Sequence, residues 1–151
     1  MASLNKSAWK IIPEFRSTNI RRTVAFYTES LHFTLGGTHP EDENSVPIYC
    51  SVFMGKKAEA NIHFFDETAP TDSTKKSSQD EKPFVCSSAK IALGTTELDE
   101  YYELLKQESK VNITQPIEDT PWGWRHFTVA DPDGNTITFF KFLEGGNPGT
   151  E

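Results

Sequence analysis

The sequence predicts an α+β fold made of two halves that share one order of elements, strand–helix–strand–strand–strand. Hydrophobic patterns with the period of a strand and of a helix recur in this order in both halves. A polar segment from Asp66 to Lys82 separates the halves, and it holds no aromatic and no β-branched apolar residue. The 151 residues suffice for one compact domain or for two tightly fused half-domains.

The first half begins with a strand expected over residues 9–15, in which Pro13 indicates an edge strand or a strand end. A helix with Asn19 at its N-cap position follows. The apolar stripe of this helix consists of Ile20, Val24, Tyr27 and Leu31. Three further strands are expected over residues 33–35, 46–54 and 58–65, the first of them ended by Gly36 and Gly37.

The second half repeats the pattern, with strands expected over residues 84–93, 111–117, 125–130 and 136–142. Its helix opens at Thr96, which with Asp99 forms an acidic variant of the capping box. One face of this helix carries Leu98, Tyr101, Tyr102 and Leu105. The segment Asp131–Gly134 places Pro and Gly where a tight turn favours them. Its two aspartates are therefore expected to bond the local backbone rather than to act as an acid–base pair.

These elements predict one domain over residues 8–143, with modules at 8–67 and 84–143. The polar residues 68–83 between the modules are expected to form a mobile linker, because they offer little to bury. Residues 144–151 are expected to form a flexible tail.

Composition narrows the classes of function. Fifteen basic and 22 acidic residues give a net charge of −7, which argues against binding to nucleic acid. This acidity suits a cationic small ligand, and it also serves solubility alone. No apolar run is long enough to span a membrane and no secretory signal is visible, so a cytoplasmic protein is expected. Cys50 and Cys86 are then expected to be reduced, buried thiols.

Three stretches carry a resemblance to a known family: IPEFRSTNIRRTVAFYTESLHFT (residues 12–34), LDEYY (98–102) and PWGWRHFTVADPDGN (121–135). They resemble the bleomycin resistance proteins of the vicinal oxygen chelate superfamily, which also includes glyoxalase I and extradiol dioxygenases. The DPDGN turn is widespread in the superfamily, and the PWG before it is more particular to the bleomycin-resistance branch. The resemblance implies two βαβββ modules that form an incomplete mixed-sheet barrel around a cleft. It also implies a homodimer whose clefts are shared between chains, often with exchange of a strand or arm.

Metal-dependent members of the superfamily hold a transition metal with His and Glu side chains near strand centres. The positions in this chain that match those ligands are Ile12, His63, Lys90 (or Ser88) and Thr138. Only His63 among them is a metal-binding residue type suited to such a site, whereas a catalytic zinc needs three protein ligands. We therefore expect no metal and no cofactor, and a lone histidine between Ile62 and Phe64 suits a core residue or a pocket wall.

The segment PWGWRHF presents two tryptophans that belong either to the core or to a ligand pocket. Pro121 and Gly123 favour a loop that enters the strand, and in the bleomycin-resistance pattern the tryptophan of PWG, here Trp122, lines the drug cleft. Aromatic walls of this kind stack on planar ligands. Strand alternation allows only one of Arg125 and His126 to share the cleft with the aromatic residues.

The expected function is sequestration of a planar or cationic small molecule in an aromatic cleft at a homodimer interface. The candidate ligand-binding residues are Trp122, Trp124, His126, His63, Tyr49, Phe53 and Phe140. Phe142 is expected to extend the wall with Phe140, and Phe64 is a further candidate from the first module. A cofactor-free isomerase, cyclase or lyase is the alternative, with His63 or His126 as the general base. A metal-dependent glyoxalase or dioxygenase ranks third, because Thr138 stands where such enzymes carry Glu.

Overall fold

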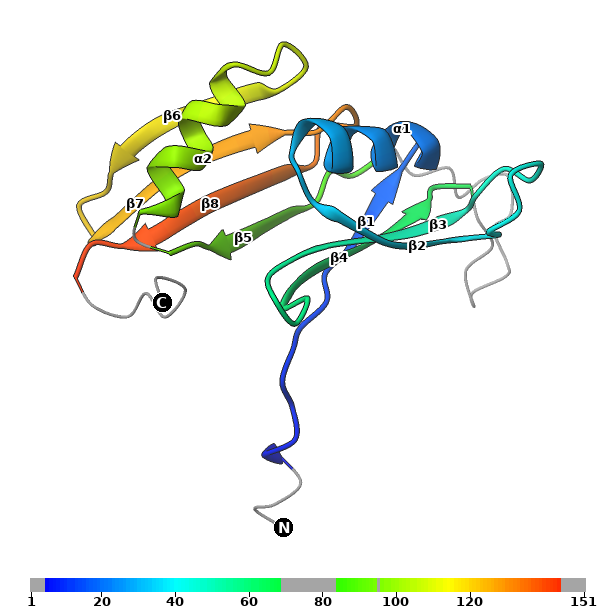
Figure 1. The fold of residues 1–151 in the computed structure, drawn as a ribbon, viewed down its shortest axis with the longest axis horizontal. Coiled ribbons are helices and arrows are strands. Elements are labelled where there is room, and N and C mark those ends of the chain that lie inside the picture. The colour runs from blue at the N-terminus through cyan, green and yellow to red at the C-terminus, as the bar shows by residue number, and fades with distance from the viewer. Residues whose placement is uncertain (1–4, 69–83, 95, 145–151) are drawn as a thin grey trace.

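The structure is a computed structural model, and it describes residues 5–68, 84–94 and 96–144. It contains two four-stranded mixed sheets, one from each half of the sequence (Figure 1). The predicted α+β class and the repeated βαβββ order are therefore confirmed. Each sheet is open, and neither closes into a barrel.

The elements of the first module are β1 (Glu14–Ser17), α1 (Ile20–Ala25), η2 (Phe26–Ser30), β2 (Thr34–His39), β3 (Tyr49–Met54) and β4 (Ala60–Asp66). Those of the second module are β5 (Ser88–Ala92), α2 (Glu97–Lys106), β6 (Asn112–Asp119), β7 (Trp124–Ala130) and β8 (Thr136–Phe142). The strand orders are β1-β4-β3-β2 and β5-β8-β7-β6. In both sheets the outer pair β1–β4 or β5–β8 is parallel and the other pairs are antiparallel.

One hydrophobic core serves both modules. Tyr27 of η2 packs on Phe64 of β4 with 4.8 Å between ring centroids, and Tyr101 of α2 packs on Phe139 of β8 at 4.9 Å. The modules meet where Phe33 contacts Phe139 and where the Tyr101 hydroxyl donates a hydrogen bond to the carbonyl of Leu31. Such ring pairs add to the stability gained from burial. The relative placement of the two sheets therefore rests on packed side chains.

The DPDGN turn also joins the modules. The Asp131 carboxylate accepts hydrogen bonds from the backbone N–H groups of Asp133 and Asn135, as the sequence predicted, and another from the Tyr27 hydroxyl at 3.0 Å. Burial raises the pKa of Asp131, and the hydrogen bonds it accepts oppose that rise. The prediction is wrong for Asp133, because its carboxylate accepts hydrogen bonds from Thr18 and forms an ion pair with Arg22 of the first module at 2.8 Å. The turn thus orients one module on the other, which its local sequence did not reveal.

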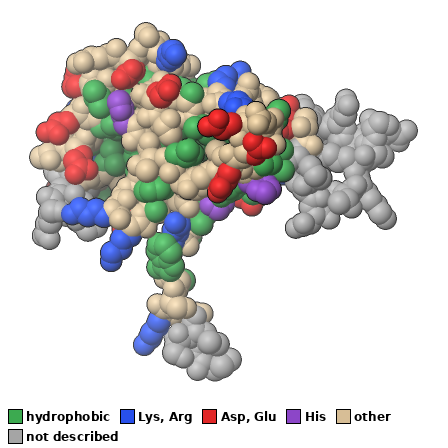
Figure 2. All heavy atoms as spheres, turned by 45° about the vertical axis from the view of Figure 1, so that its right-hand side comes forward, with side chains coloured by type: hydrophobic (Ala, Val, Ile, Leu, Met, Phe, Trp, Pro, Cys, Tyr) green, Lys and Arg blue, Asp and Glu red, His purple; other side chains and the backbone are tan. Residues whose placement is uncertain are grey.

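The prediction that the first strand spans residues 9–15 is wrong, because β1 covers only Glu14–Ser17. Residues 5–12 leave the body of the molecule as an extended arm (Figures 1 and 2). Pro13 has no backbone N–H to give to a sheet, although its carbonyl accepts a hydrogen bond from the N–H of His63. Trp9 and Ile11 on this arm are 68% and 88% exposed.

Three smaller predictions also need correction. β2 runs on through Gly36 and Gly37, with an irregularity in its register to β3. Thr96 caps α2 by position only, since its side chain makes no capping hydrogen bond and Asp99 bonds Arg125 instead. Cys50 is buried as expected, and burial raises the pKa of its thiol to about 12, but Cys86 is exposed.

The Asn19 cap of the first helix is confirmed, because its side chain accepts a hydrogen bond from the N–H of Arg22 at 3.0 Å. Most of the predicted linker and tail, residues 69–83 and 145–151, lies outside the described residues. Within the described part of the chain, neither α1 nor α2 is long and apolar enough to cross a membrane.

Candidate functional site

Each sheet has a closed face packed against helix and an open face on the opposite side. Alternation along β7 shows this arrangement: Arg125 and Phe127 contact α2 through Asp99 and Tyr101, whereas His126 points the other way and contacts Trp122. The sequence prediction that only one of Arg125 and His126 would join the aromatic residues therefore agrees with the geometry.

The open face of the second sheet is covered by aromatic rings. Trp124 stacks on Phe140 with 4.8 Å between centroids and 26° between planes, and Phe142 meets both rings edge-on. The ammonium group of Lys90 on β5 lies 4.9 Å from the centroid of Trp124. We call this surface the second-sheet aromatic face, made by Lys90, Trp122, Trp124, His126, Phe140 and Phe142.

A tight turn holds Trp122 beside this face. Gly123 has φ +91°, a backbone conformation that favours glycine, and its N–H donates to the carbonyl of Thr120. Its carbonyl accepts from the N–H of Leu143, which ties the turn to the chain after β8. Trp122 is 63% exposed and its ring contacts those of Trp124 and His126 edge-on. Trp122 is therefore outside the core of a single chain.

The first sheet has a different open face, which we call the first-sheet open face: Glu14, Tyr49, Phe53, His63 and Phe65. Tyr49 of β3 contacts both His63 and Phe65 of β4, each at 5.2 Å between ring centroids. Glu14 on β1 is the direct parallel partner of His63. This face therefore combines aromatic rings with an adjacent carboxylate and imidazole.

The environment of His63 favours its neutral form. Partial burial lowers the pKa of His63, the neighbouring Glu14 carboxylate opposes that shift, and Lys10 adds a smaller lowering effect. A neutral imidazole near neutral pH can accept a proton or a hydrogen bond. On the other sheet, His126 has its Nε2 atom 3.8 Å from a carboxylate oxygen of Glu118.

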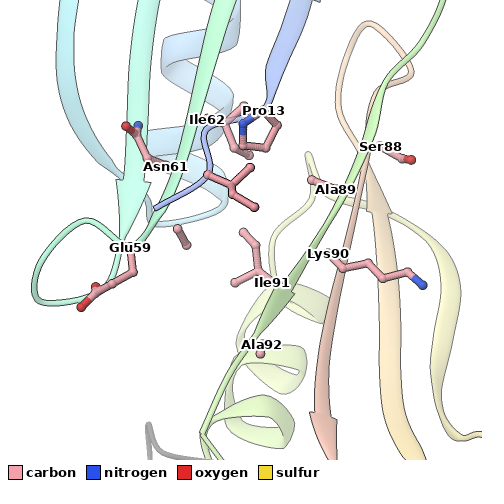
Figure 3. A pocket seen from close by; sticks show the side chains of 11 residues that line it. Pro13, Glu59, Asn61, Ile62, Ser88, Ala89, Lys90, Ile91 and Ala92 are labelled. Carbon is pink, nitrogen blue, oxygen red and sulfur yellow. The ribbon is translucent and has the colours of Figure 1, made fainter. Parts of the chain in front are cut away.

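A groove of about 530 Å³ runs between the modules (Figure 3). Pro13 and Ile62 line it on one side and Ala89, Ile91 and Ala92 of β5 on the other. Figure 3 shows Ile91 directed toward the first module, whereas Lys90 extends away from the groove over β8. None of the aromatic residues predicted to bind ligand lines this groove, because those residues lie on the sheet faces.

The structure thus divides the predicted site residues between two surfaces. Trp122, Trp124, His126 and Phe140 gather on the second-sheet aromatic face. Tyr49 and His63 contact each other on the first sheet, and Phe53 shares their face by alternation along β3. Phe64, which follows His63 in the sequence, does not line a ligand site on this face, because its side chain is fully buried in the core.

Sequence reasoning missed the contact that Lys90 makes. Lys90 was considered only as a matched metal-ligand position, although it lies over the ring of Trp124. Its register partner Thr138 on β8 also faces the open side, where its hydroxyl lies 2.8 Å from that of Thr128. Alternation along β5 could have placed Lys90 on the open face of the sheet. Its contact with Trp124 of β7 could not be predicted without the order of strands in the sheet.

The residues at the superfamily's metal-ligand positions do not fit a transition metal. Ile12 offers no donor atom, the ammonium of Lys90 lies over a tryptophan ring, and the hydroxyl of Thr138 bonds that of Thr128. Among the described residues, no cluster of three or more His, Cys, Asp or Glu side chains could hold a metal ion.

Comparison with known proteins agrees with the fold. Bleomycin resistance proteins from Geobacillus stearothermophilus and Staphylococcus aureus are 28% identical to this chain over 140 residues, which cover 88% of it and 96% of each relative. TioX from Micromonospora sp. ML1 superposes with a TM-score of 0.68 at 18% identity, covering 90% of this chain and all of that chain. A glyoxalase/bleomycin resistance protein/dioxygenase from Nocardioides gives 0.65 at 22% identity, covering 99% of this chain and 95% of the other.

At these identities the structural likeness concerns the fold alone. The family model for the Glyoxalase/Bleomycin resistance protein/Dioxygenase superfamily matches residues 13–139, which span most of both modules. The superfamily predicted from the sequence is thereby confirmed, and this chain belongs to the Glyoxalase/Bleomycin resistance protein/Dioxygenase superfamily.

Proposed function

We propose that this protein binds and sequesters a planar small molecule on the second-sheet aromatic face. The observation that most supports this proposal is the surface of rings formed by Trp124, Phe140 and Phe142, with the exposed Trp122 beside it. Stacked and edge-on aromatic pairs each contribute about 0.5–1.5 kcal/mol beyond burial of area. The names of the relatives from Geobacillus stearothermophilus and Staphylococcus aureus support resistance to bleomycin as the biological role.

The proposed binding cleft lies at the interface of a homodimer. In one chain the aromatic rings lie on an open sheet face, and ligand pockets usually enclose most of their ligand. A second chain supplies the missing wall when its first-sheet open face covers the second-sheet aromatic face. Exposed Trp9 and Ile11 on the extended arm offer apolar surface for the same partner. The cleft then combines His63 and Tyr49 of one chain with Trp122 and Trp124 of the other.

The proposed role of Trp122 can be tested with Trp122→Ala. A fully buried tryptophan replaced by alanine typically costs about 3–5 kcal/mol, but this exposed side chain should cost far less. Binding of bleomycin, measured by isothermal titration calorimetry, should weaken or disappear while the unfolding temperature changes little. Trp9→Ala serves as a matched control for an exposed tryptophan on the arm. A large loss of stability, or a stable variant with unchanged binding, would refute the role given to Trp122.

Cofactor-free catalysis is the second candidate function, and the pairing of His63 with Glu14 favours it. A partly buried, neutral imidazole beside a carboxylate is suited to abstract a proton from a bound substrate. If the protein is an enzyme of this kind, His63→Gln abolishes turnover and leaves binding of the small molecule within a fewfold of wild type. Turnover that survives in His63→Gln would eliminate this base, and His126→Gln would then test the other histidine.

A further inference from the structure

We propose that Glu14 of one chain forms an ion pair with Lys90 of a second copy of the chain when their open faces come together. This inference rests on the dimeric cleft of the proposed function. It adds the contact that decides which faces meet and in which register, and it assigns Lys90 to the partner chain rather than to the ligand.

Glu14 and Lys90 occupy equivalent positions in the two modules. Glu14 on β1 is the parallel register partner of His63 on β4, and Lys90 on β5 is that of Thr138 on β8. His63 and Thr138 match each other, because each directly precedes the fully buried phenylalanine of its strand that packs on a tyrosine of the helical segment. Equivalent positions on the two open faces therefore carry opposite charges.

Neither charge is paired within its own chain. The ion pairs among the described residues include neither Glu14 nor Lys90, and both side chains are exposed. Figure 3 shows Lys90 directed away from the first module and over β8, where its ammonium lies 4.9 Å from the centroid of Trp124. Both charges are therefore available to a second chain, and each open face offers the charge that the other lacks at this position.

The charges along β1 also distinguish between registers. Arg16 lies two residues after Glu14 on the same side of β1, and its guanidinium lies 5.9 Å from the centroid of Phe65. A partner shifted by two residues along β1 would bring its Lys90 against Arg16 instead of Glu14. Like charges in contact across an interface disfavour the wrong arrangement strongly. The ion pair therefore selects one register of the partner.

The same two charges favour pairing of unlike faces. Two first-sheet open faces packed on each other would put two Glu14 carboxylates and no Lys90 in one cleft, and two second-sheet aromatic faces would put two Lys90 ammoniums in another. When unlike faces meet, each cleft receives one of each charge, and twofold symmetry repeats the pair in the second cleft. Burial of exposed rings such as Trp122 supplies affinity, and the ion pair supplies specificity.

The test mixes two charge-reversal variants of the full-length protein, Glu14→Lys and Lys90→Glu. Each variant alone sets like charges against each other in both clefts, so its homodimer dissociation constant should rise about tenfold, measured by sedimentation velocity. In a mixed dimer of the two variants, each cleft again holds one lysine and one glutamate. Equal amounts mixed at low salt should therefore form mainly mixed dimers, counted by native mass spectrometry, whereas random pairing gives about half. High salt should reduce this preference.

A matched mixture controls for net charge. Glu100→Lys and Lys110→Glu make the same changes of charge at exposed positions outside both open faces, and they should pair at random. Neutral variants provide a second measurement. Glu14→Gln and Lys90→Met should each weaken the dimer, and the double variant should weaken it no more than either single variant, because both remove the same contact.

Binding of bleomycin to the wild type, measured by calorimetry, separates this inference from the proposed function. Random pairing of Glu14→Lys with Lys90→Glu, in a protein whose wild type is a dimer that binds bleomycin, overturns the inference and leaves the proposed function standing. A preference for mixed dimers in a protein that binds no bleomycin supports the ion pair and counts against the proposed function. A monomeric wild type would eliminate both the ion pair and the shared cleft.

Discussion

The two modules share one topology, but their open faces have different chemistry. The second sheet presents stacked rings of Trp124 and Phe140 with Lys90 over them, whereas the first presents His63 between Tyr49 and Glu14. On the closed faces the modules are alike, since Phe64 and Phe139 are both fully buried against aromatic side chains of the helices. The repeated pattern therefore specifies the scaffold through one set of alternating positions. The other set is free to differ between modules and to carry function.

The largest expected effect is the difference in stability lost when a phenylalanine is removed from a closed face or from an open face. Phe64→Ala and Phe139→Ala each remove a fully buried ring and should lower the free energy of unfolding by about 3–5 kcal/mol. Their neighbours provide matched controls on the same strands, because both lie on part-exposed faces. Phe65→Ala loses its ring contact with Tyr49 and should cost about 1 kcal/mol, and Phe140→Ala loses two, with Trp124 and Phe142, and should cost about 1–3 kcal/mol. Urea unfolding of the four variants measures the difference. Equal costs within either pair would show that the faces were assigned wrongly.

A smaller effect is expected where the turn orients one open face relative to the other. Tyr27→Phe removes the hydroxyl that donates to the Asp131 carboxylate across the module boundary. The loss should cost about 1–3 kcal/mol, because Asp131 is buried and keeps only its bonds within the DPDGN turn. Thr28→Val provides a control, since the Thr28 hydroxyl bonds only the Val24 carbonyl within the first module. Unfolding in urea that shows no loss for Tyr27→Phe would contradict this role of the turn.

The network that holds α2 on the closed face of the second sheet should contribute less. Burial would raise the pKa of Asp99, but hydrogen bonds from Arg125 and Lys141 outweigh it and lower that pKa. The Asp99 carboxylate should therefore stabilise the fold above the ordinary aspartate pKa, and this stabilisation should disappear as pH falls through the lowered pKa. Because Asp99 is half-exposed, Asp99→Asn should cost about 0.2–1 kcal/mol at pH 7, less at high salt, and progressively less as pH falls below the ordinary aspartate pKa. A cost that is independent of pH and salt would argue against ion pairing.

The smallest effect concerns the titration of His63, a feature of the first-sheet open face. Burial lowers the pKa of His63, and the Glu14 carboxylate partly raises it again. Glu14→Gln removes that carboxylate charge and should therefore lower the pKa further. The depressed pKa means that the neutral imidazole stabilises the fold above pH 6.5, and that this contribution declines as pH falls through the folded-state value. NMR titration of the His63 ring protons measures this pKa in the wild type and in Glu14→Gln. A midpoint above 6.5 in the wild type, or an upward shift in Glu14→Gln, would contradict the assignment.

Periodicity predicted the elements well where one face of a strand or helix is buried. The last strand was predicted with its observed ends, 136–142, because its residues alternate between core and open face. The first strand was predicted too early, since Trp9 and Ile11 look like strand residues but pair with none of the described strands. Hydrophobicity alone does not distinguish an edge strand from an arm.

The candidate site was only partly predictable, for a related reason. Alternation correctly placed His126 with Trp122 and Arg125 on the other side. The same alternation along β4 allows only one of His63 and Phe64 to face a pocket, but both were predicted as site residues, and Phe64 is buried in the core. The contact of Lys90 with Trp124 depends on β8 lying between β5 and β7, which is a property of the sheet rather than of any local stretch.

A mixed-dimer experiment tests the central claim most directly, namely that the open faces of two different chains form one cleft. Tyr49→Ala damages the first-sheet open face and Trp124→Ala damages the second-sheet aromatic face, so neither variant alone should bind bleomycin normally. When the two variants are unfolded and refolded together, random pairing should restore about one quarter of the wild-type number of sites, measured by calorimetry. The account predicts this recovery, because each mixed dimer holds one cleft built from two undamaged faces. No recovery, with mixed dimers verified by native mass spectrometry, would show that the faces of different chains do not form a common cleft.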